Sequence, residues 1–395
     1  MQPLNARFDT AGIEAIPFRA SDGTQLSLNR IVARGAHGGA AARSDGRTDE
    51  RPAVLLLHGH TASADMFVLP ETRNMVDVLL DADYEPWLLD WRGSCRLPHN
   101  ETSARFSYDD VALYDIPEAI SYVRGRIGGR QLFVVAHCIG AMCLSMSMAA
   151  GLVPGLAAVV AQGVFLTPKL SGRTRVLMHL GGELLRTRLD HVPIDIRKTG
   201  LWSKYTPLFA LASRGARCPD PTCQMLHNST WAMGASLFVH DNLDVRTHDR
   251  LADLFGPVPV WSLPHMRRIE LAHSMLRWNH GDLRYRALPE NALDRADRID
   301  SPLLLISGSQ NKLWLDSNKL CHDILTSRHP DLDVRYVEVP GYGHVDTFIG
   351  RSAALDVFGH IVEFLDEHRL DEPRLDEHRL DEHHLNEHHL DERRS

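Results

Sequence analysis

Gln131-Leu-Phe-Val-Val-Ala-His-Cys-Ile-Gly-Ala-Met-Cys143 is the stretch that decides the fold of this 395-residue chain. Its apolar first half predicts a buried strand, and its small-residue second half predicts a helix. Between them lies Ala136-His-Cys-Ile-Gly140, which has the form of a nucleophile elbow with Cys138 in the position of the usual serine. The alternative is a core crossover in which Cys138 is buried and inert.

A second segment predicts part of an oxyanion hole. Ala53-Val-Leu-Leu-Leu-His-Gly-His-Thr61 is a buried-strand pattern that ends in a His-Gly turn. After such a turn, backbone N–H groups can point at a developing negative charge. We expect the backbone N–H groups of His60 and of Ile139, the residue after Cys138, to be the two donors.

A third segment predicts a general base. Val334-Arg-Tyr-Val-Glu-Val-Pro-Gly-Tyr-Gly-His344 reads as a late strand followed by a glycine-flanked loop. Taken alone, a loop histidine is most often a solvated surface group. Together with the elbow, His344 becomes the expected base for Cys138.

The residue that orients His344 is expected after the apolar run 302–308, in the loop that contains Asn311. A Cys–His–Asn set is chemically coherent, because a thiolate–imidazolium pair needs only a neutral amide to hold the ring in its working tautomer. The alternative for Asn311 is a plain turn-capping role. Asp316 and Asp346 are rival orienting carboxylates, and the sequence does not rank them.

These segments, in this order, resemble the α/β-hydrolase superfamily over roughly residues 12–367. Asp90-Trp-Arg-Gly-Ser-Cys95 adds to the likeness. Alternating strand and helix patterns also favour a mostly parallel, doubly wound α/β sheet with helices on both faces. The resemblance implies that a mainly helical cap is inserted over the carboxyl ends of the strands.

Within that superfamily the chain is most similar to the hydrolase-like domain associated with GMC-type oxidoreductases of the cholesterol-oxidase group. The likeness depends on the elbow, on Cys218-Pro-Asp-Pro-Thr-Cys223, on Phe238-Val-His-Asp-Asn-Leu243 with Thr247-His-Asp249, and on Tyr342-Gly-His-Val-Asp346. It implies hydrolysis or acyl transfer on apolar substrates and an oxidoreductase partner. No strand–G-x-G-x-x-G–helix unit occurs, so a flavin-binding half is missing from the sequence and no cofactor is expected.

Composition narrows the class of partner. A formal charge of −8 and the lack of a basic patch interleaved with aromatic residues argue against nucleic acid. No apolar signal region begins the sequence, and no run approaches the ~20 apolar residues that a membrane span requires. We therefore expect a cytoplasmic protein without a membrane span.

The six cysteines are expected to be free thiols in that compartment. Cys218 and Cys223 form a C-x₄-C pair, but no second pair at zinc-finger spacing follows closely, and His227 is the only near histidine. The sequence therefore predicts no metal site.

Four regions are expected along the chain. Residues 1–164 and 301–367 would form the two parts of the hydrolase core, with residues 165–300 as the cap. Residues 368–395 read as a low-complexity tail, because Asp-Glu-His-Arg-Leu and its variants recur with period five from Asp366 to Arg394. Such a charged, proline-containing repeat is expected to be disordered and without a catalytic role.

The sequence predicts two functions from different classes. In the first, Cys138 attacks an ester or thioester of an apolar acyl or steroid-like substrate, and the acyl group passes to water or to another acceptor. In the second, the fold is a catalytically silent lipid- or steroid-binding module that serves an oxidoreductase. The cysteine, Ala136 and Asn311 favour the second, because all three depart from the strongest hydrolase pattern.

Overall fold

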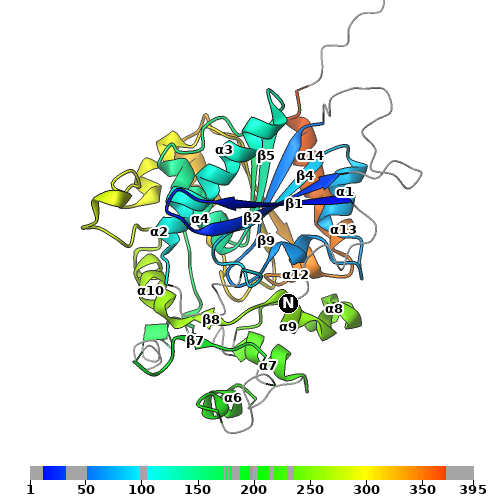
Figure 1. Ribbon diagram of the computed structural model, residues 1–395, viewed down its shortest axis with the longest axis vertical. Helices are drawn as coiled ribbons and strands as arrows, with labels where there is room; N and C mark the ends of the chain where they lie inside the picture. Colours follow the sequence, from blue (N-terminus) through cyan, green and yellow to red (C-terminus); the bar gives the residue numbers. More distant parts are fainter. Residues whose placement is uncertain are drawn as a thin grey trace, which may run out of the picture.

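An eight-stranded sheet forms the centre of the molecule in the computed structural model, which describes residues 12–32, 51–97, 105–172, 174–176, 178–179, 187–195, 197, 203–213, 218–228 and 235–370. The strand order is β1-β2-β4-β3-β5-β6-β9-β10 (Figure 1). The first two strands pair antiparallel and β2 pairs antiparallel with β4, whereas the other neighbours are parallel. The predicted α/β class with a mostly parallel sheet is confirmed. The strands are β1 (Gly12–Arg19), β2 (Gln25–Val32), β3 (Ala53–Leu57), β4 (Glu85–Asp90), β5 (Leu132–His137), β6 (Val159–Gln162), β9 (Leu303–Gly308) and β10 (Val334–Val339).

The central strands are buried on both faces. Every residue of β3, β4, β5, β6 and β9 is buried, which explains why these segments are mostly continuous apolar runs without alternation. Helices α3 (Ile116–Ile127) and α4 (Ile139–Ala149) cover one face, and α1 (Met75–Asp81) and α14 (Phe358–Glu367) cover the other (Figure 1). The sheet is therefore wound on both sides, with α4 buried along its whole length.

Shorter elements complete the core. A π-helical turn, Val111–Asp115, joins the short helix α2 to α3. The remaining core elements are η2 (Ala64–Phe67), α2 (Tyr108–Asp110), α11 (Ser317–Arg328), α12 (Asp346–Ile349) and α13 (Ala353–Asp356).

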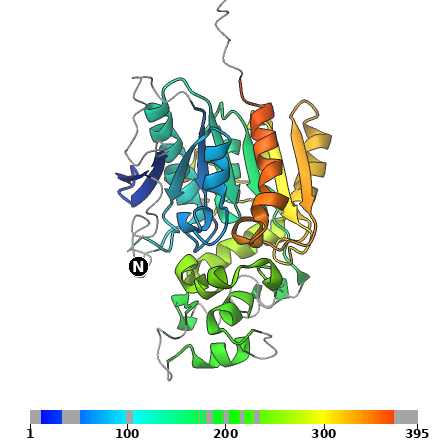
Figure 2. The same cartoon turned by 90° about the vertical axis from the view of Figure 1, so that its right-hand side faces the viewer.

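The residues predicted to form the cap, 165–300, lie between β6 and β9 in the chain. Figure 2 shows its green segments gathered at one end of the sheet, the end at which α12 also lies. Its last part returns to the core, where Nη1 of Arg298 donates to the carbonyl of Ala150 beyond α4. The described cap elements are β7 (His191–Val192), α6 (Thr206–Ala212), α7 (Pro221–Asn228), η6 (His240–Asn242), α8 (Val245–Asp249), α9 (Leu251–Leu254), β8 (Val258–Pro259), η7 (Val260–Ser262), α10 (Leu263–Ala272), η8 (Leu283–Tyr285) and η9 (Ala292–Arg298).

Two expectations concern the ends of the chain and the membrane. In the part of the chain that the structure describes, no helix is both long enough and apolar enough to cross a bilayer. The repeat tail lies outside the described residues from position 371 onward, so its disorder stays a prediction.

Candidate functional site

Cys138 occupies a sharp turn between β5 and α4. Its backbone has φ +54° and ψ −125°, a conformation that is costly for any residue with a side chain. The turn needs small neighbours. A Cβ on Gly140 would lie 2.4 Å from the carbonyl oxygen of His58, and a Cβ on Gly59 would lie 3.1 Å from Cβ of Cys138. The structure therefore forms the elbow that the motif predicts, with the strain concentrated at Cys138.

Three N–H groups approach the sulfur of Cys138. The backbone N–H groups of Ile139 and His60 both donate to it, and Nε1 of Trp314 donates over 3.4 Å. Burial nevertheless dominates and raises the pKa of the Cys138 thiol to about 11, although the three donors oppose that shift. The two backbone donors expected for an oxyanion hole thus meet at the nucleophile position.

His344 follows β10 and lies beside the elbow. One ring nitrogen of His344, one of His137 and the sulfur of Cys138 all lie within 4.8 Å of one another. Gly163, with φ +87°, makes room for the ring, because a Cβ there would lie 2.5 Å from its Cε1. Burial lowers the pKa of His344 to about 3. The raised pKa of the thiol and the lowered pKa of the imidazole both favour a neutral resting pair over the thiolate–imidazolium pair expected from the sequence.

Asn311 contacts the His344 ring with its amide nitrogen. Its Oδ1 accepts from the backbone N–H groups of Leu313 and Trp314, at 3.2 and 3.1 Å. Because backbone N–H groups only donate, the other amide atom must be Nδ2, which lies 3.5 Å from Nδ1 of His344 and 3.4 Å from Oγ of Ser307. This contact favours Nδ1 as the acceptor, which places the proton of the neutral ring on Nε2. This tautomer is the opposite of the one expected from the sequence.

The two rival carboxylates lie elsewhere. Asp316 pairs with Lys169, with its Oδ1 2.7 Å from Nζ, and its side chain is half exposed. Asp346 accepts from the backbone N–H of Gly343 at 3.0 Å and from Nδ2 of Asn242 at 2.7 Å. Among the described residues neither carboxylate forms a hydrogen bond with the His344 ring, so neither is placed to orient it.

The sequence interpretation missed three residues of this site. Trp314 reaches the sulfur from the loop after β9, and Gly163 shapes the space for His344. The ring of His137 lies 4.7 Å from that of His344, centroid to centroid, and burial holds its pKa well below the usual value. His137 stands inside the elbow motif itself, which was the available signal; Trp314 and Gly163 carry no comparable signal.

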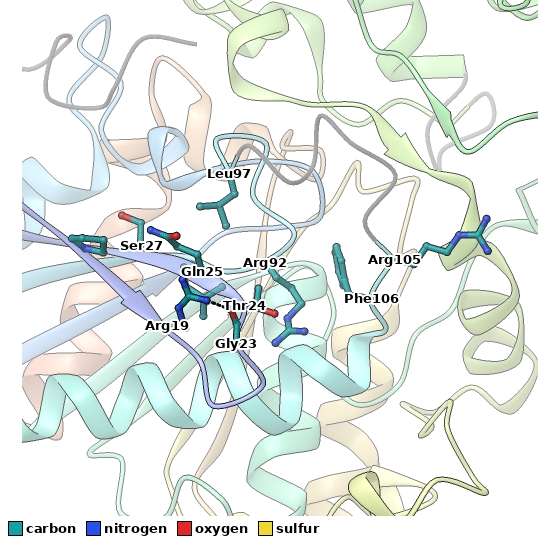
Figure 3. A pocket seen from close by; sticks show the side chains of 11 residues that line it. Arg19, Gly23, Thr24, Gln25, Ser27, Arg92, Leu97, Arg105 and Phe106 are labelled. Atoms are coloured by element: carbon teal, nitrogen blue, oxygen red, sulfur yellow. Dashed lines mark hydrogen bonds between the residues drawn. The ribbon is translucent and has the colours of Figure 1, made fainter.

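A separate surface pocket lies beside the β1–β2 hairpin (Figure 3). Its volume is about 710 Å³, and Arg19, Arg92 and Phe106 are among its lining residues. Arg92 is bound by Asp22 and Asp115, at 2.8 and 2.6 Å. None of the residues predicted for the acyl-transfer site lines this pocket, so we do not assign it to that chemistry.

Comparisons with known proteins agree with the fold. Residues 52–175 match the family described as alpha/beta hydrolase fold. Mouse lipase member K is 23% identical over 88% of this chain and 86% of its own length. Human gastric triacylglycerol lipase is 34% identical over 128 residues, which cover 30% of each protein. The stronger identity is therefore confined to about three tenths of that lipase.

Solved structures share the fold at low sequence identity. A carboxyl esterase from Bacillus coagulans superposes with a TM-score of 0.54 at 13% identity, over 90% of this chain and 98% of its own. A thermophilic esterase from Thermogutta terrifontis gives 0.52 at 13% identity, over 90% and 100%. The four relatives named above are lipases and esterases. The likeness to an oxidoreductase-associated domain stays a prediction.

Proposed function

Since this chain has the α/β-hydrolase fold, we propose that it cleaves esters with Cys138 as the nucleophile. The observation that carries the proposal is the convergence of the Ile139 and His60 N–H groups on the sulfur of Cys138. Donors in that position are also placed to bind the oxygen of a carbonyl that the sulfur attacks. The strained backbone at Cys138 supports the same role.

The reaction proceeds in two steps. As the thiol proton leaves for His344, the sulfur bonds to the ester carbonyl carbon, and the carbonyl electron pair moves to oxygen. The N–H groups of Ile139 and His60 then donate to this oxyanion. Collapse of the tetrahedral intermediate expels the alcohol, which takes the proton from His344, and leaves a thioester on Cys138. Water then attacks the thioester carbonyl, the C–S bond breaks, the acyl group leaves as a carboxylic acid, and the thiol is restored.

The proton transfer is the costly part of this scheme. To accept a proton at Nε2, the His344 ring must first carry its other proton on Nδ1. That proton would face the amide nitrogen of Asn311, so a weak hydrogen bond becomes a contact between two donors. Such a change costs about 1–3 kcal/mol. We therefore infer a slow hydrolase whose rate is limited by the Asn311 contact.

The substrate class that we propose is a lipid-like ester with an apolar acyl group. The lipases named above support it, as does an apolar cap in which Phe238, Met266 and Met275 are fully buried. A thioester substrate, or transfer to an acceptor other than water, belongs to the same proposal, because both use the same acyl-enzyme. All six cysteines are free thiols, which supports the proposal that the protein works in the reducing cytoplasm.

The second function is the silent lipid- or steroid-binding module that serves an oxidoreductase. Two observations favour it. Asn311 holds His344 in the tautomer that cannot act as a base at Nε2, and burial raises the pKa of Cys138. In that case the elbow would be retained for its shape and not for its chemistry.

Intact-mass measurement of the acyl-enzyme separates the two. Wild type, Cys138→Ala and Cys95→Ser would be incubated briefly with nitrophenyl esters and thioesters of increasing chain length. We expect an adduct of acyl mass on wild type and Cys95→Ser, and none on Cys138→Ala. Cys95 is a matched control, since it is also buried and has a raised pKa. Neither adduct nor turnover across the panel would support the binding module, and turnover retained by Cys138→Ala would rule out the proposed nucleophile.

A further inference from the structure

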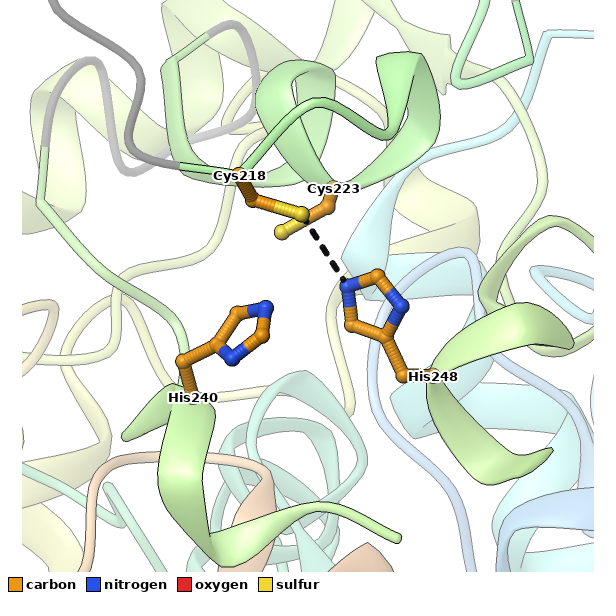
Figure 4. Close-up of side chains that lie close together, drawn as sticks. All are labelled: Cys218, Cys223, His240 and His248. Atoms are coloured by element: carbon orange, nitrogen blue, oxygen red, sulfur yellow. Dashed lines mark hydrogen bonds between the residues drawn. The ribbon is translucent and has the colours of Figure 1, made fainter. Parts of the chain in front are cut away.

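Four metal-ligating side chains meet in the cap, away from the elbow. They are Cys218, Cys223, His240 and His248, and one ligand atom of each lies within 4.8 Å of those of the other three. Figure 4 shows the two thiols and the two imidazoles turned toward one another around a common centre. The C-x₄-C pair was visible in the sequence. Its histidine partners, however, lie 17 and 25 residues beyond Cys223.

We propose that this cluster, the Cys₂His₂ cluster, is a structural zinc site. Two cysteines and two histidines are a ligand set that zinc prefers, and tetrahedral zinc takes four such ligands. All four positions are filled by protein, which leaves no open position for water or substrate. The set is therefore of the closed, structural kind and not of the catalytic kind.

The spacing of the ligands agrees with zinc. Zn–S bonds of about 2.3 Å and Zn–N bonds of about 2.0–2.1 Å place a sulfur and a nitrogen about 3.6 Å apart in a tetrahedron. Sγ of Cys218 lies 3.5 Å from Nε2 of His248. A thiol–imidazole hydrogen bond would account for that one pair, but it would not account for the approach of Cys223 and His240 to the same point.

The burial of the four side chains also fits. Cys223 is buried, Cys218 and His248 are half-buried, and His240 is exposed. An ion can therefore reach the cluster from the His240 side while the thiolates stay shielded from solvent. The turn before α7 is held in place, because Oδ1 of Asp220 accepts from the backbone N–H of Cys223 at 2.8 Å.

The position of the Cys₂His₂ cluster indicates what the metal would do. It joins α7, η6 and α8, which are short elements of eight, three and five residues. The segment just before His240 is bonded to the loop that carries His344, because the backbone N–H groups of His344 and Val345 both donate to the carbonyl of Leu237 at 3.0 Å. Zinc would thus fasten the cap to the loop of the candidate base.

Metal analysis of the full chain tests the site. The protein would be grown with zinc, purified without an immobilised-metal column, and washed with a mild chelator to strip the histidine-rich tail. We expect about one zinc per chain in wild type and in the surface control His360→Ala, and almost none in Cys218→Ser or His248→Ala. Equal zinc in wild type and Cys218→Ser would overturn the proposal.

Cobalt substitution and a mercurial reagent keep the test independent of how the variants fold. Cobalt in wild type should give intense tetrahedral bands and a sulfur-to-cobalt charge-transfer band. The tail cannot produce the charge-transfer band, because it contains histidines but no cysteine. A thiol-specific mercurial should release the zinc. A Cys218–Cys223 disulfide in protein kept under reducing conditions, seen as the loss of the two thiol hydrogens in the intact mass, would refute the site.

Hydrogen exchange gives the structural readout. Removing zinc should lower the thermal unfolding temperature and speed exchange of the backbone N–H groups of His344 and Val345. Re-addition of zinc should restore both. Unchanged exchange at these two positions in zinc-free protein would contradict the proposed brace, whatever the outcome of the acyl-enzyme experiment.

Discussion

The amide nitrogen of Asn311 faces Nδ1 of His344 over 3.5 Å, because the amide oxygen is already bound by the backbone N–H groups of Leu313 and Trp314. The contact keeps the ring proton on Nε2, the nitrogen that would have to accept a proton from Cys138. An amide in this place thus opposes base catalysis, whereas a carboxylate would promote it.

Replacing Asn311 by aspartate should activate the enzyme. The Asn311→Asp variant keeps one oxygen for the two backbone donors and offers the other to an Nδ1–H of His344. We expect kcat/KM for ester hydrolysis to rise by ~10²-fold. In a serine-protease triad, an asparagine in place of the aspartate holds the histidine in the wrong tautomer and lowers kcat by ~10⁴-fold. The carboxylate should also raise the pKa of His344 and shift the acidic limb of the pH–rate profile upward.

Asn311→Ala is the control for that experiment. It removes the amide nitrogen without supplying an acceptor for an Nδ1–H, so any gain in rate should be smaller than that of Asn311→Asp. If Asn311→Asp hydrolyses esters no faster than wild type, the contact does not limit the rate, and the assignment of His344 as base loses its main support.

The space at Gly163 should be essential to the position of His344. A methyl group in Gly163→Ala would lie 2.5 Å from Cε1 and 2.7 Å from Nδ1 of the ring, so the ring must move. We expect kcat to fall by at least ~10²-fold, because small misplacements of a reacting group have effects of this size.

Gly128→Ala is a matched control. Gly128 also has positive φ but has nothing within 4 Å, so its substitution should lower stability by about 1–2 kcal/mol through backbone strain and leave kcat unchanged. Equal effects of the two substitutions on kcat would argue against a positional role for Gly163.

The sequence was sufficient for the sheet and the elbow because both follow from local patterns. Continuous apolar runs become β3 and β5, and small residues flank Cys138 where the turn requires them. The order of these segments along the chain also identified the loops that meet at the carboxyl ends of the strands.

The direction of the Asn311 amide could not be read in the same way, since it depends on where two later backbone N–H groups point. The pairing of Asp316 with Lys169 joins residues that are 147 positions apart. For the same reason the metal ligands His240 and His248 were not connected with the C-x₄-C pair. Their meeting depends on the path of the cap, which local pattern does not encode.

The indole of Trp314 should control the reactivity of Cys138. Its Nε1–H lies 3.4 Å from the sulfur and lowers the thiol pKa against the larger effect of burial. Trp314→Phe removes this donor, so the pKa should rise above about 11 and alkylation by iodoacetamide at pH 9 should slow several-fold. Peptide mapping would follow the modification at Cys138 alone.

Trp87→Phe provides the comparison for Trp314→Phe. Trp87 is equally buried, but its indole N–H donates to Glu85, so Cys138 should react as in wild type. Faster alkylation of Cys138 in Trp314→Phe would mean that the indole shields the thiol more than it activates it, and the electrostatic role would be abandoned.

Mild acid should destabilise the fold through buried histidines, among them His58, His60, His137 and His344. Desolvation lowers the pKa of each, to about 3 for His60 and His344. A histidine whose pKa is lower in the folded state takes up its proton on unfolding. The stability that it contributes is present above its unfolded pKa of ~6.5 and is lost as the pH falls toward the folded value.

The size of the acid effect follows from the same linkage. Each of these histidines should lower the free energy of unfolding by about 1.4 kcal/mol per pH unit below ~6.5. Asp115, whose pKa burial raises to about 6, takes up one proton more readily in the folded state than in the unfolded state. It therefore stabilises the fold as the pH falls and offsets the effect of one histidine. Guanidinium unfolding at pH 7.5, 6.5 and 5.5 should therefore show a steep loss of stability. His344→Gln should reduce the slope of the free energy of unfolding against pH by one proton, and the exposed His360→Gln should leave the slope unchanged. A free energy of unfolding that stays constant between pH 7.5 and 5.5 would show that these histidines are not held neutral by burial.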